Sequence, residues 1–484
     1  MKYYSNYNYF LNFKENLSKD IDVIISENKY LGFTMFFQEQ SCNITTFNET
    51  LLPQLRRYKD LEPTEVLTGL IREIDLKKHD PYQIIFHGLM VLYYEKHDKF
   101  YLVDISKALR RTPNDSNAEA QSIIGSRDGF TENFKDNISL IRSRLKNSNL
   151  LIEEFSIGRR SKTWVGLLYI DDIHDDGKRN EIVKILTSID IDAVVSINDL
   201  LPYFSSHQIL PVTNYTGLPD LATTRLLNGE FLLVIDRIPV VLSLPVSFNS
   251  LTEERIDYVN NRPLRLLQKG MVLLCFFLST SFLGVFLSFL TFQVDALSLP
   301  LLSTLAVTQK GAIFPIVLEI LFVLFLFELY HLVGFRSSEK TLSSTLVLIG
   351  GLIIGQNLID SGLVGVLVIT LTALSFLSGF VVSNNIHLSF GISILRLLYI
   401  LAALFFGLLG ISIVAVISTV HFSKQSFLGE HFFYPFIPFD FDGIKDYFKA
   451  RSNQKRYLRR NVAATKDQTM KRVKRWEKLF YFLL

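Results

Sequence analysis

The sequence predicts a mixed α/β soluble N-terminal region, made of two subdomains, followed by an α-helical multi-span transmembrane domain. Three observations support this prediction. Charged residues of both signs are dispersed among short apolar runs up to about residue 268, which is typical of a water-soluble domain. From Met271 to Phe422 charged residues become rare, and several runs there reach the roughly 20 apolar residues that a transmembrane helix needs. A chain of 484 residues is long enough for about three domains.

The soluble region divides at a polar stretch, "RRTPNDSNAEAQS", whose proline and two asparagines are typical of a linker. On either side of it, a pair of apolar strands surrounds a charged turn: "GLMVLYYEKHDKFYLVDI" before the linker and "GEFLLVIDRIPVVLSLPV" after it. The two hairpins are consistent with a distant duplication of one subdomain, but they are weak evidence for it. We therefore predict soluble subdomains at 1–115 and 116–255, a transmembrane helical domain at 256–425 and a basic cytoplasmic C-terminal tail at 426–484.

The second soluble subdomain opens with the pattern of an amphipathic helix. In "GFTENFKDNISLIRSRLK", Thr131 is the predicted N-cap, and Phe134, Ile138 and Ile141 recur on one helical face. An extended segment up to Gly158, a strand at 165–170 and a helix at 178–188 are predicted next. Helices that alternate with strands indicate a mixed α/β fold.

A basic turn separates the extended segment from the strand at 165–170. It contains Arg159, Arg160 and Lys162. One interpretation is a solvated strand end. The other is an electropositive contact for a partner subunit or for lipid head groups, and the sequence leaves both open.

Five long apolar runs predict the membrane helices, at 271–292, 312–335, 342–358, 363–382 and 392–420. Basic residues at Arg262, Arg265 and Lys269 precede the first run, and the tail is basic as well, so both ends are expected in the cytoplasm and the number of crossings should be even. Either the short apolar piece at 297–307 is a further crossing or one long run is re-entrant. The start of the chain lacks a continuous apolar stretch, so we expect no cleaved signal peptide.

Several classes of function are disfavoured by the sequence. It contains no P-loop, no dinucleotide-binding glycine motif and no metal-ligating spacing of histidine and cysteine, so we expect neither an enzyme nor a metal or cofactor. Cys42 and Cys275 fall in different regions, which makes a disulfide unexpected. After Ala450 the tail holds eleven lysines and arginines against two acidic residues. This charge suits a cytoplasmic end and contact with membrane lipids rather than nucleic acid.

Two carboxylates interrupt the apolar run "PIVLEILFVLFLFELYHLVG". Glu319 and Glu328 are candidate functional residues, because an ionisable group within a span costs roughly 2.5 to 3.5 kcal/mol even on lenient insertion scales. On a continuous helix they would lie about 14 Å apart along the axis and about half a turn apart around it. Either they lie toward opposite interfaces, with Glu328 near His331 and Arg336, or each faces a different protein neighbour. A third interpretation is that both are helix-end residues with local partners.

The run "LVLIGGLIIGQNLIDSG" predicts a helix, Thr345 to Asp360, with a glycine face for packing and a polar face for water. Gly351 and Gly355 form a pair of small residues that allows close helix approach. A ring of such polar faces would line a pore, although the same residues could form the polar exit of a span. The candidate pore-lining residues are Gln356, Asn357, Ile359 and Asp360.

Six motifs occur in the same order as in the A subunit of the GerA family of spore germination receptors, which this chain resembles over roughly residues 118 to 445. They are "DGFTENFKDNISLIRSRLK", "IGRRSKT", "LPDLATTRLLNGEFLLVIDRIPVVLSLPVSF", "LPLLSTLAVTQKGAIFPIVLE", "FELYHLVGFR" and "IGGLIIGQNLIDSGLVG". The resemblance implies a germinant receptor subunit of the spore inner membrane. It also implies two partners, a B-type transporter-like nutrient-sensing subunit and a C-type lipoprotein subunit. The A subunit is expected to form a homo-oligomer that acts as a nutrient-gated cation channel and triggers germination.

The chain departs from the family pattern at two positions. Leu324 and Leu332 stand where family members usually carry glutamates, which weakens any mechanism that needs a dense acidic cluster. Two other functions stay open. One is a non-conducting membrane scaffold that couples a nutrient-binding partner to germination, and the other is an ion-coupled transporter that uses Glu319 or Glu328.

Overall fold

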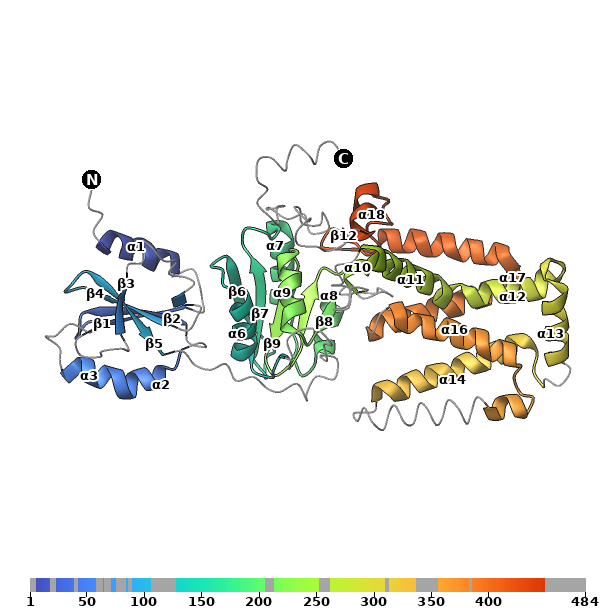
Figure 1. The fold of residues 1–484 in the computed structure, drawn as a ribbon, viewed down its shortest axis with the longest axis horizontal. Helices are drawn as coiled ribbons and strands as arrows, with labels where there is room; N and C mark the ends of the chain where they lie inside the picture. Colours follow the sequence, from blue (N-terminus) through green and yellow to red (C-terminus); the bar gives the residue numbers. More distant parts are fainter. Residues whose placement is uncertain are drawn as a thin grey trace. The chain divides into compact units, whose positions relative to one another are not determined.

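The structure is a computed structural model, in which the chain divides into an α/β unit and a helical unit (Figure 1). The α/β unit comprises residues up to 245, and the helical unit comprises residues 246–448. The structure describes residues 6–17, 23–38, 42–57, 64, 71–74, 84–85, 89–105, 128–204, 213–251, 262–309, 313–336, 356–382 and 385–448.

The first sheet of the α/β unit contains five antiparallel strands in the order β1-β2-β4-β5-β3. The predicted hairpin of β4 and β5 is confirmed, with Leu89 paired to Asp104 and Tyr94 to Lys99. The strands are β1 (Val23–Asn28), β2 (Phe33–Gln38), β3 (Ile71–Ile74), β4 (Leu89–Tyr94) and β5 (Lys99–Asp104).

Helices cover both faces of this sheet, because alternate residues of a strand point to opposite faces. Val91 and Tyr93 pack under α1 (Asn6–Leu17), whereas Met90 and Leu92 pack on the other face against α3 (Leu52–Arg57) and the turns before it. Figure 1 shows α1 on one side of the sheet and α2 (Ile44–Thr46) with α3 on the other. A π-helical turn, Phe47–Leu51, joins α2 to α3.

The second sheet repeats the strand order of the first. Its order is β6-β7-β9-β10-β8, so in both sheets the third strand of the sequence lies at the edge beyond the fifth, and all pairs are antiparallel. This shared topology supports a duplication more strongly than the two hairpins in the sequence do. The strands are β6 (Leu150–Ile157), β7 (Thr163–Ile170), β8 (Asn214–Thr216), β9 (Phe231–Ile235) and β10 (Val241–Leu244).

One face of the second sheet packs against α6 (Phe134–Arg144) and α9 (Pro219–Leu227). The predicted apolar stripe of α6 forms this contact, but the predicted N-cap is wrong. Asn133 caps α6, since its side chain accepts the backbone N–H of Lys135 at 2.9 Å. Thr131 instead donates its backbone N–H to the Asn137 side chain at 2.7 Å, because Asn137 is fully buried and needs that partner.

The remaining helices of the α/β unit are short or peripheral. The predicted helix at 178–188 is present as α7 (Asp176–Ser188), which begins earlier because Asp175 caps it through the N–H of Gly177. A 3-10 turn (Ile197–Asp199) and α8 (Leu201–Phe204) follow it.

The helical unit contains most of the apolar runs that the sequence predicts as spans. The run at 271–292 appears as two helices, α11 and α12, and the runs at 312–335 and 363–382 appear as α14 and α16. Most of the run at 342–358 lies outside the described residues. The helices are α10 (Phe248–Leu251), α11 (Arg262–Thr280), α12 (Phe282–Phe292), α13 (Leu299–Gln309), α14 (Ile316–Arg336), α16 (Val366–Val382), α17 (Ile386–Lys424) and α18 (Phe441–Phe448), with a 3-10 turn (Val294–Ala296) after α12.

One described helical run, His387–Lys424, is both long and apolar enough to cross a membrane by length and composition. A bent pair, Leu266–Thr280 with Phe282–Phe292, would be a second if its two helices form one broken span across their 48° bend. Val366–Val382 is apolar but shorter.

The long run α17 reverses its direction at Gly407. This glycine has φ 56° and ψ −141°, a backbone conformation that residues with a β-carbon rarely adopt. The Tyr399 hydroxyl lies 3.5 Å from the Ser418 hydroxyl, whereas nineteen residues of straight helix would span about 28 Å. Leu388 and Phe422, near the two ends of α17, share one core cluster. The run is therefore a helical hairpin whose arms are 386–406 and 408–424.

Candidate functional site

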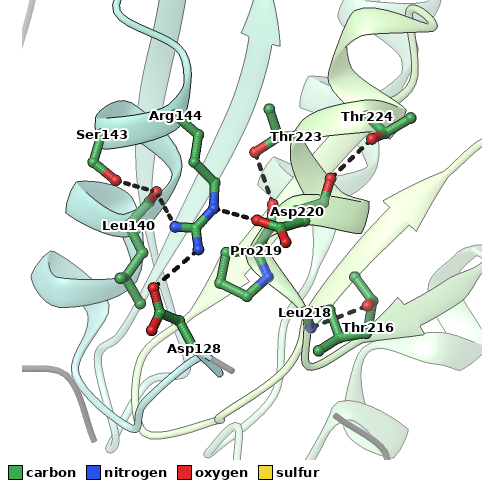
Figure 2. Close-up of polar contacts among 10 residues, drawn as sticks. All are labelled: Asp128, Leu140, Ser143, Arg144, Thr216, Leu218, Pro219, Asp220, Thr223 and Thr224. Atoms are coloured by element: carbon green, nitrogen blue, oxygen red, sulfur yellow. Dashed lines mark hydrogen bonds and ion pairs between the residues drawn. The ribbon is translucent and has the colours of Figure 1, made fainter. Parts of the chain in front are cut away.

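Arg144 gathers three separate segments of the α/β unit at the ends of α6 and α9 (Figure 2). Its Nε donates to Asp220 Oδ1 at 2.5 Å, and its Nη2 donates to Asp128 Oδ2 at 3.2 Å. Its Nη1 donates to the carbonyl oxygen of Leu140 at 2.9 Å, so each of its three nitrogens has a partner. Asp128 and Arg144 both belong to the motif "DGFTENFKDNISLIRSRLK", and Asp220 belongs to the motif that begins "LPDLATTRLL", so two of the motifs that carry the family resemblance meet here.

The sequence around Asp220 explains how this carboxylate reaches Arg144. Leu218 and Pro219 begin α9, and proline at the first helical position suits the start of a helix because its missing N–H would have no helical partner. Asp220 then lies in the first turn, where the helix dipole favours a negative charge. Thr223 and Thr224 donate their hydroxyls to the carbonyl oxygens of Pro219 and Asp220 at 2.7 and 2.9 Å. The cluster therefore holds together α6, α9 and the segment at Asp128 that precedes α6.

The basic turn between β6 and β7 contacts two carboxylates that the sequence pattern did not predict as its partners. Arg159 Nε lies 2.7 Å from Asp190 Oδ1, and Arg160 Nε lies 3.8 Å from Asp192 Oδ2. The backbone N–H of Arg159 also donates to the carbonyl oxygen of Ile191 at 2.9 Å. All four charged side chains are at least 65% exposed. Lys162, with φ 45°, ends the turn. The turn is thus fixed to the 190–192 loop, which offsets much of its positive charge.

Glu328 lies in a polar network inside the helical unit. The Ser393 hydroxyl donates to Glu328 Oε1, and the Nη1 of Arg396 lies 3.7 Å from the same oxygen. His331 Nδ1 lies 3.5 Å from Glu328 Oε2, and its Nε2 lies 3.3 Å from the Ser389 hydroxyl. The Arg396 side chain is 3% exposed, so this is a buried charge with a carboxylate as its counter-ion.

The same arginine connects α17 to two further helices. Arg396 Nε donates to the carbonyl oxygen of Ser279 on α11 at 2.7 Å. Ser375 on α16 donates its hydroxyl to that carbonyl at 3.3 Å, and the Arg396 guanidinium lies 5.7 Å from the centre of the Phe376 ring. The network therefore joins α11, α14, α16 and α17, and we call it the four-helix network. It consists of Ser279, Glu328, His331, Ser375, Ser389, Ser393 and Arg396.

The sequence predicts only one end of the four-helix network. Glu328 is expected near His331, as observed, and near Arg336, whose side chain is outside the described residues. The cation that faces Glu328 is Arg396, which is 68 positions further along the chain. A signal for it exists in "SFGISILR". Ser389, Ser393 and Arg396 recur there at helical spacing within an apolar run, which predicts a polar stripe.

Glu319 faces a different neighbour, at the start of α16. Its Oε2 accepts the backbone N–H of Gly365 at 3.0 Å, and Gly365 in turn begins α16 by accepting the N–H of Ile369. The Glu319 side chain is 1% exposed, and its Oε1 has no hydrogen-bond partner among the described residues. A carboxylate at the start of a helix is favoured by the helix dipole. Glu319 therefore links α14 to the loop that leads from residue 360 into α16.

Part of the candidate pore-lining helix is described, from Gln356 to Asp360. Gln356, Asn357 and Asp360 are exposed, and Ile359 is half-buried. A turn follows at Gly362, with φ 67°, whose carbonyl oxygen accepts the backbone N–H of Ile313 at 3.2 Å. This turn brings the exposed polar residues and Glu319 to the same end of the unit. Gly351 and Gly355, the predicted packing residues, lie outside the described residues.

Fold and site together define a protein in which two sheets of like topology precede an apolar helical unit with an internal ion-pair network. The described part of the chain holds no group of three or more histidine, cysteine, aspartate or glutamate residues that could bind a metal ion.

The chain belongs to the GerA family. The family described as "Bacillus/Clostridium GerA spore germination protein" matches residues 11–462, which confirms the resemblance carried by the sequence motifs. The chain is 33% identical to spore germination protein XA of Bacillus anthracis, over 76% of this chain and 74% of that protein. It is 25% identical to spore germination protein KA of Bacillus subtilis, over 90% and 82%. These relatives place the chain among the A subunits of spore germination receptors.

Two further comparisons complete this picture. The chain is 28% identical to an uncharacterized membrane protein of Bacillus subtilis, YfkQ, over 75% of this chain and 71% of that protein. It is also similar to the crystal structure of the N-terminal domain of the A subunit of the Bacillus megaterium spore germinant receptor GerK3. That similarity has a TM-score of 0.36 and 22% identity, and it covers 48% of this chain and 92% of that domain.

Proposed function

We propose that this protein is the ion-conducting A subunit of a spore germinant receptor, a nutrient-gated cation channel that triggers germination. The helical unit lies in the spore inner membrane, and several copies assemble around an axial pore. The α/β unit and the basic tail lie on the cytoplasmic side. A B-type transporter-like subunit senses the nutrient, and a C-type lipoprotein completes the receptor. Family membership supports the receptor role, and the distribution of polar residues in the helical unit supports the pore.

The helical hairpin of α17 supports a multi-pass arrangement with both ends on one side. The sequence gives five long apolar runs, an odd number, although the basic flanks require an even one. The run at 392–420 contributes two arms because the chain reverses at Gly407. With α11–α12 as one broken span, α14, the run at 342–358 and α16, the count becomes six. Neither the short piece at 297–307 nor a re-entrant run is then needed to make the count even.

The observation that carries the proposal is the exposed polar surface beside Glu319. In a hydrocarbon environment, exposed amide and carboxylate side chains are costly unless water or another subunit covers them. Gln356, Asn357 and Asp360 are exposed in the single chain, at an end of the unit where Glu319 holds the following loop. In a ring of subunits these side chains would face a shared water-filled path. Rings of carboxylates favour cations, and rings of apolar side chains such as Ile359 close a pore by dewetting.

Ion flux through reconstituted protein tests the proposal. In liposomes, or in dormant spores that carry each variant, Ile359→Ala is expected to leak cations without nutrient, and Asp360→Asn to lower cation conductance at normal protein levels. Asp295→Asn is the matched control, because Asp295 is an exposed carboxylate in the turn after α12 and far along the chain from the polar helix. Unchanged flux from both test variants would remove this helix from the pore.

Two alternatives make different predictions in the same experiment. A non-conducting scaffold would show no flux for the wild type or for any variant, while still co-purifying with the nutrient-sensing and lipoprotein subunits. An ion-coupled transporter would behave as a monomer with a cavity at mid-membrane, and its flux would saturate with substrate. Glu328 suits transport poorly, because Arg396 and Ser393 already hold its carboxylate.

A further inference from the structure

An aromatic segment follows the end of α17. Between positions 432 and 441, "FFYPFIPFDF" contains six aromatic residues in ten. Two of them are buried, two are partly buried and two are exposed. Phe432 and Phe433 are 4% and 8% exposed, whereas Phe439 and Phe441 are 74% and 62% exposed. The outer pair leaves two large apolar side chains in contact with solvent. Burying such side chains against a suitable partner would be favourable, because it removes apolar surface from water.

The inner residues hold this segment at the C-terminal end of α17. A two-residue hairpin, β11 (Ser426–Phe427) with β12 (Glu430–His431), turns the chain back after Lys424. Phe432 then donates its backbone N–H to the carbonyl oxygen of Gln425 at 3.4 Å. The Phe433 ring lies 5.4 Å from the ring of Phe422 in the last turn of α17. The segment therefore cannot extend away from the end of the helix.

The outer residues are also held in a defined place. The Tyr434 hydroxyl donates to Asp440, the residue between Phe439 and Phe441. The backbone N–H of Asp440 donates to the carbonyl oxygen of Pro435 at 3.0 Å. Tyr447 on α18 is 2% exposed, and the Lys269 ammonium of α11 lies 5.1 Å from the centre of its ring. Phe439 and Phe441 therefore lie at fixed positions on a folded segment, residues 432–441, which packs near α11 and α18.

The distribution of polar and apolar residues along the second arm of α17 indicates the environment of Phe439 and Phe441. Exposed apolar side chains continue along the arm to Val420, and His421, Ser423 and Lys424 follow at its end. If this arm crosses the membrane, as the proposed function requires, the change from apolar to polar marks the boundary between hydrocarbon and head groups. Trp and Tyr are enriched at that boundary, and segments that lie in the plane of the interface bury Trp, Phe and Leu there. The tail that follows is strongly basic, which complements anionic lipid head groups.

We propose that Phe439 and Phe441 form an interfacial anchor that inserts into the head-group region of the bilayer on the cytoplasmic side. Its partner is the lipid surface itself. The anchor fixes the depth at which α17 ends and leaves α18 at the membrane surface. This inference rests on the proposed membrane insertion of the helical unit.

Fluorescence quenching by brominated lipids tests the anchor in the full-length protein. The chain contains two tryptophans, and replacing both, Trp164→Phe and Trp476→Phe, gives a silent background. Phe439→Trp and Phe441→Trp, each placed alone in this background, report on the anchor in vesicles of phosphatidylcholine and phosphatidylglycerol. Bromine near the head groups is expected to quench both more strongly than bromine near the chain ends.

Three control positions separate the anchor from the membrane insertion on which it rests. Val416→Trp on α17 and Leu377→Trp on α16 report on exposed apolar positions of the helical unit, and quenching there should be strongest with bromine near the chain ends. Val195→Trp, at a position that is 81% exposed in the α/β unit, should be unquenched by either lipid.

Each result has one meaning for the proposal. Quenching at 416 or 377 without quenching at 439 and 441 would overturn the anchor and leave the membrane insertion intact. The same pattern with 439 and 441 also shielded from aqueous iodide would mean that another protein surface covers them, which overturns the anchor too. Absence of quenching at 416, 377, 439 and 441 would overturn the anchor together with the proposed insertion.

Discussion

Arg144 in the α/β unit and Arg396 in the helical unit both face carboxylates, but they do so in opposite environments. The Arg144 side chain is 18% exposed, has two aspartates and a carbonyl oxygen as partners, and uses all three nitrogens. The Arg396 side chain is 3% exposed, and the one carboxylate that faces it among the described residues lies 3.7 Å away, beyond hydrogen-bond distance. Within the same part of the chain, its hydrogen bond goes to a backbone carbonyl.

The difference shows what each arginine does. When a charged side chain is in contact with water, removing its partner costs little folding free energy, because solvent replaces the partner. A buried charge has no such replacement, so removing its counter-ion is strongly destabilising even where the pair itself contributes little net stability. The Arg144 cluster therefore fixes the packing of two helices at modest energy. The four-helix network makes the packing of the helical unit depend on one ion pair.

The largest effect is expected from removing the carboxylate of the buried pair. Glu328→Gln should destabilise the helical unit by about 3 to 5 kcal/mol, because Arg396 keeps its charge in the interior without a counter-ion. Replacing both partners by apolar residues, Glu328→Leu with Arg396→Met, should recover most of that loss. The measurement is the fraction of monodisperse protein that survives heating in detergent, with Asp295→Asn as the control. A double variant as unstable as Glu328→Gln would show that the unpaired charge is not the cause.

The next largest effect is expected at the reversal of α17. Gly407→Ala should cost about 1 to 3 kcal/mol in strain, and its new β-carbon would lie 3.0 Å from the Phe292 ring. Gly270→Ala on α11 is the matched control, since a β-carbon there meets no atom within 4 Å and alanine favours a helix. The same heating assay compares the two. Equal stability of both variants would contradict a reversal at residue 407.

A smaller effect is expected when Arg144, the partly exposed counterpart of Arg396, loses its charge. Arg144→Met should destabilise the α/β unit by about 1 kcal/mol, because water can solvate Asp128 and Asp220 once the guanidinium is absent. Arg144→Lys should fall between the wild type and Met, since an ammonium cannot reproduce the three directed bonds. The fluorescence of Trp164, which lies on β7, follows denaturant unfolding of this unit. A loss as large as that of Glu328→Gln would erase the distinction between the two clusters.

The smallest effect on stability is expected at the basic turn. Arg159→Met with Arg160→Met should leave denaturant unfolding of the α/β unit unchanged, because the side chains of both arginines and of Asp190 and Asp192 are mostly exposed. The informative measurement is instead the amount of assembled or vesicle-bound protein. A decrease would favour the partner-contact interpretation of this turn, and no change would favour a solvated strand end.

Local patterns in the sequence predicted the local parts of this fold. The hairpin of β4 and β5 and the strand β7 follow from short apolar runs bounded by turns, and the apolar stripe of α6 follows from a period of 3.6 residues. The choice of Asn133 over Thr131 as N-cap depends on Asn137, whose buried amide needs Thr131 as its partner. A cap preference for single residues does not contain that information.

Long-range packing set the parts that the sequence did not predict. Arg396 could be placed opposite Glu328 only by knowing that α14 packs beside α17, and the sequence offered Arg336 nearby as a plausible alternative. The reversal at Gly407 lies within an uninterrupted apolar run, "LFFGLLG", where neither charge nor polarity marks a turn. The pore-lining role of Gln356, Asn357, Ile359 and Asp360 depends on neighbouring subunits and stays a prediction.

The repeated strand order of the two sheets has a consequence for the order of folding during synthesis. All five strands of the first sheet come from residues 23–104, and all five of the second come from residues 150–244, so neither sheet waits for a strand from elsewhere. Both stretches leave the ribosome before α11 does. Since domains generally fold as units from the N-terminus during translation, each sheet can close its hydrogen-bond ladder before the first long apolar helix emerges. The strands are then already paired when the chain first exposes a segment that must leave water.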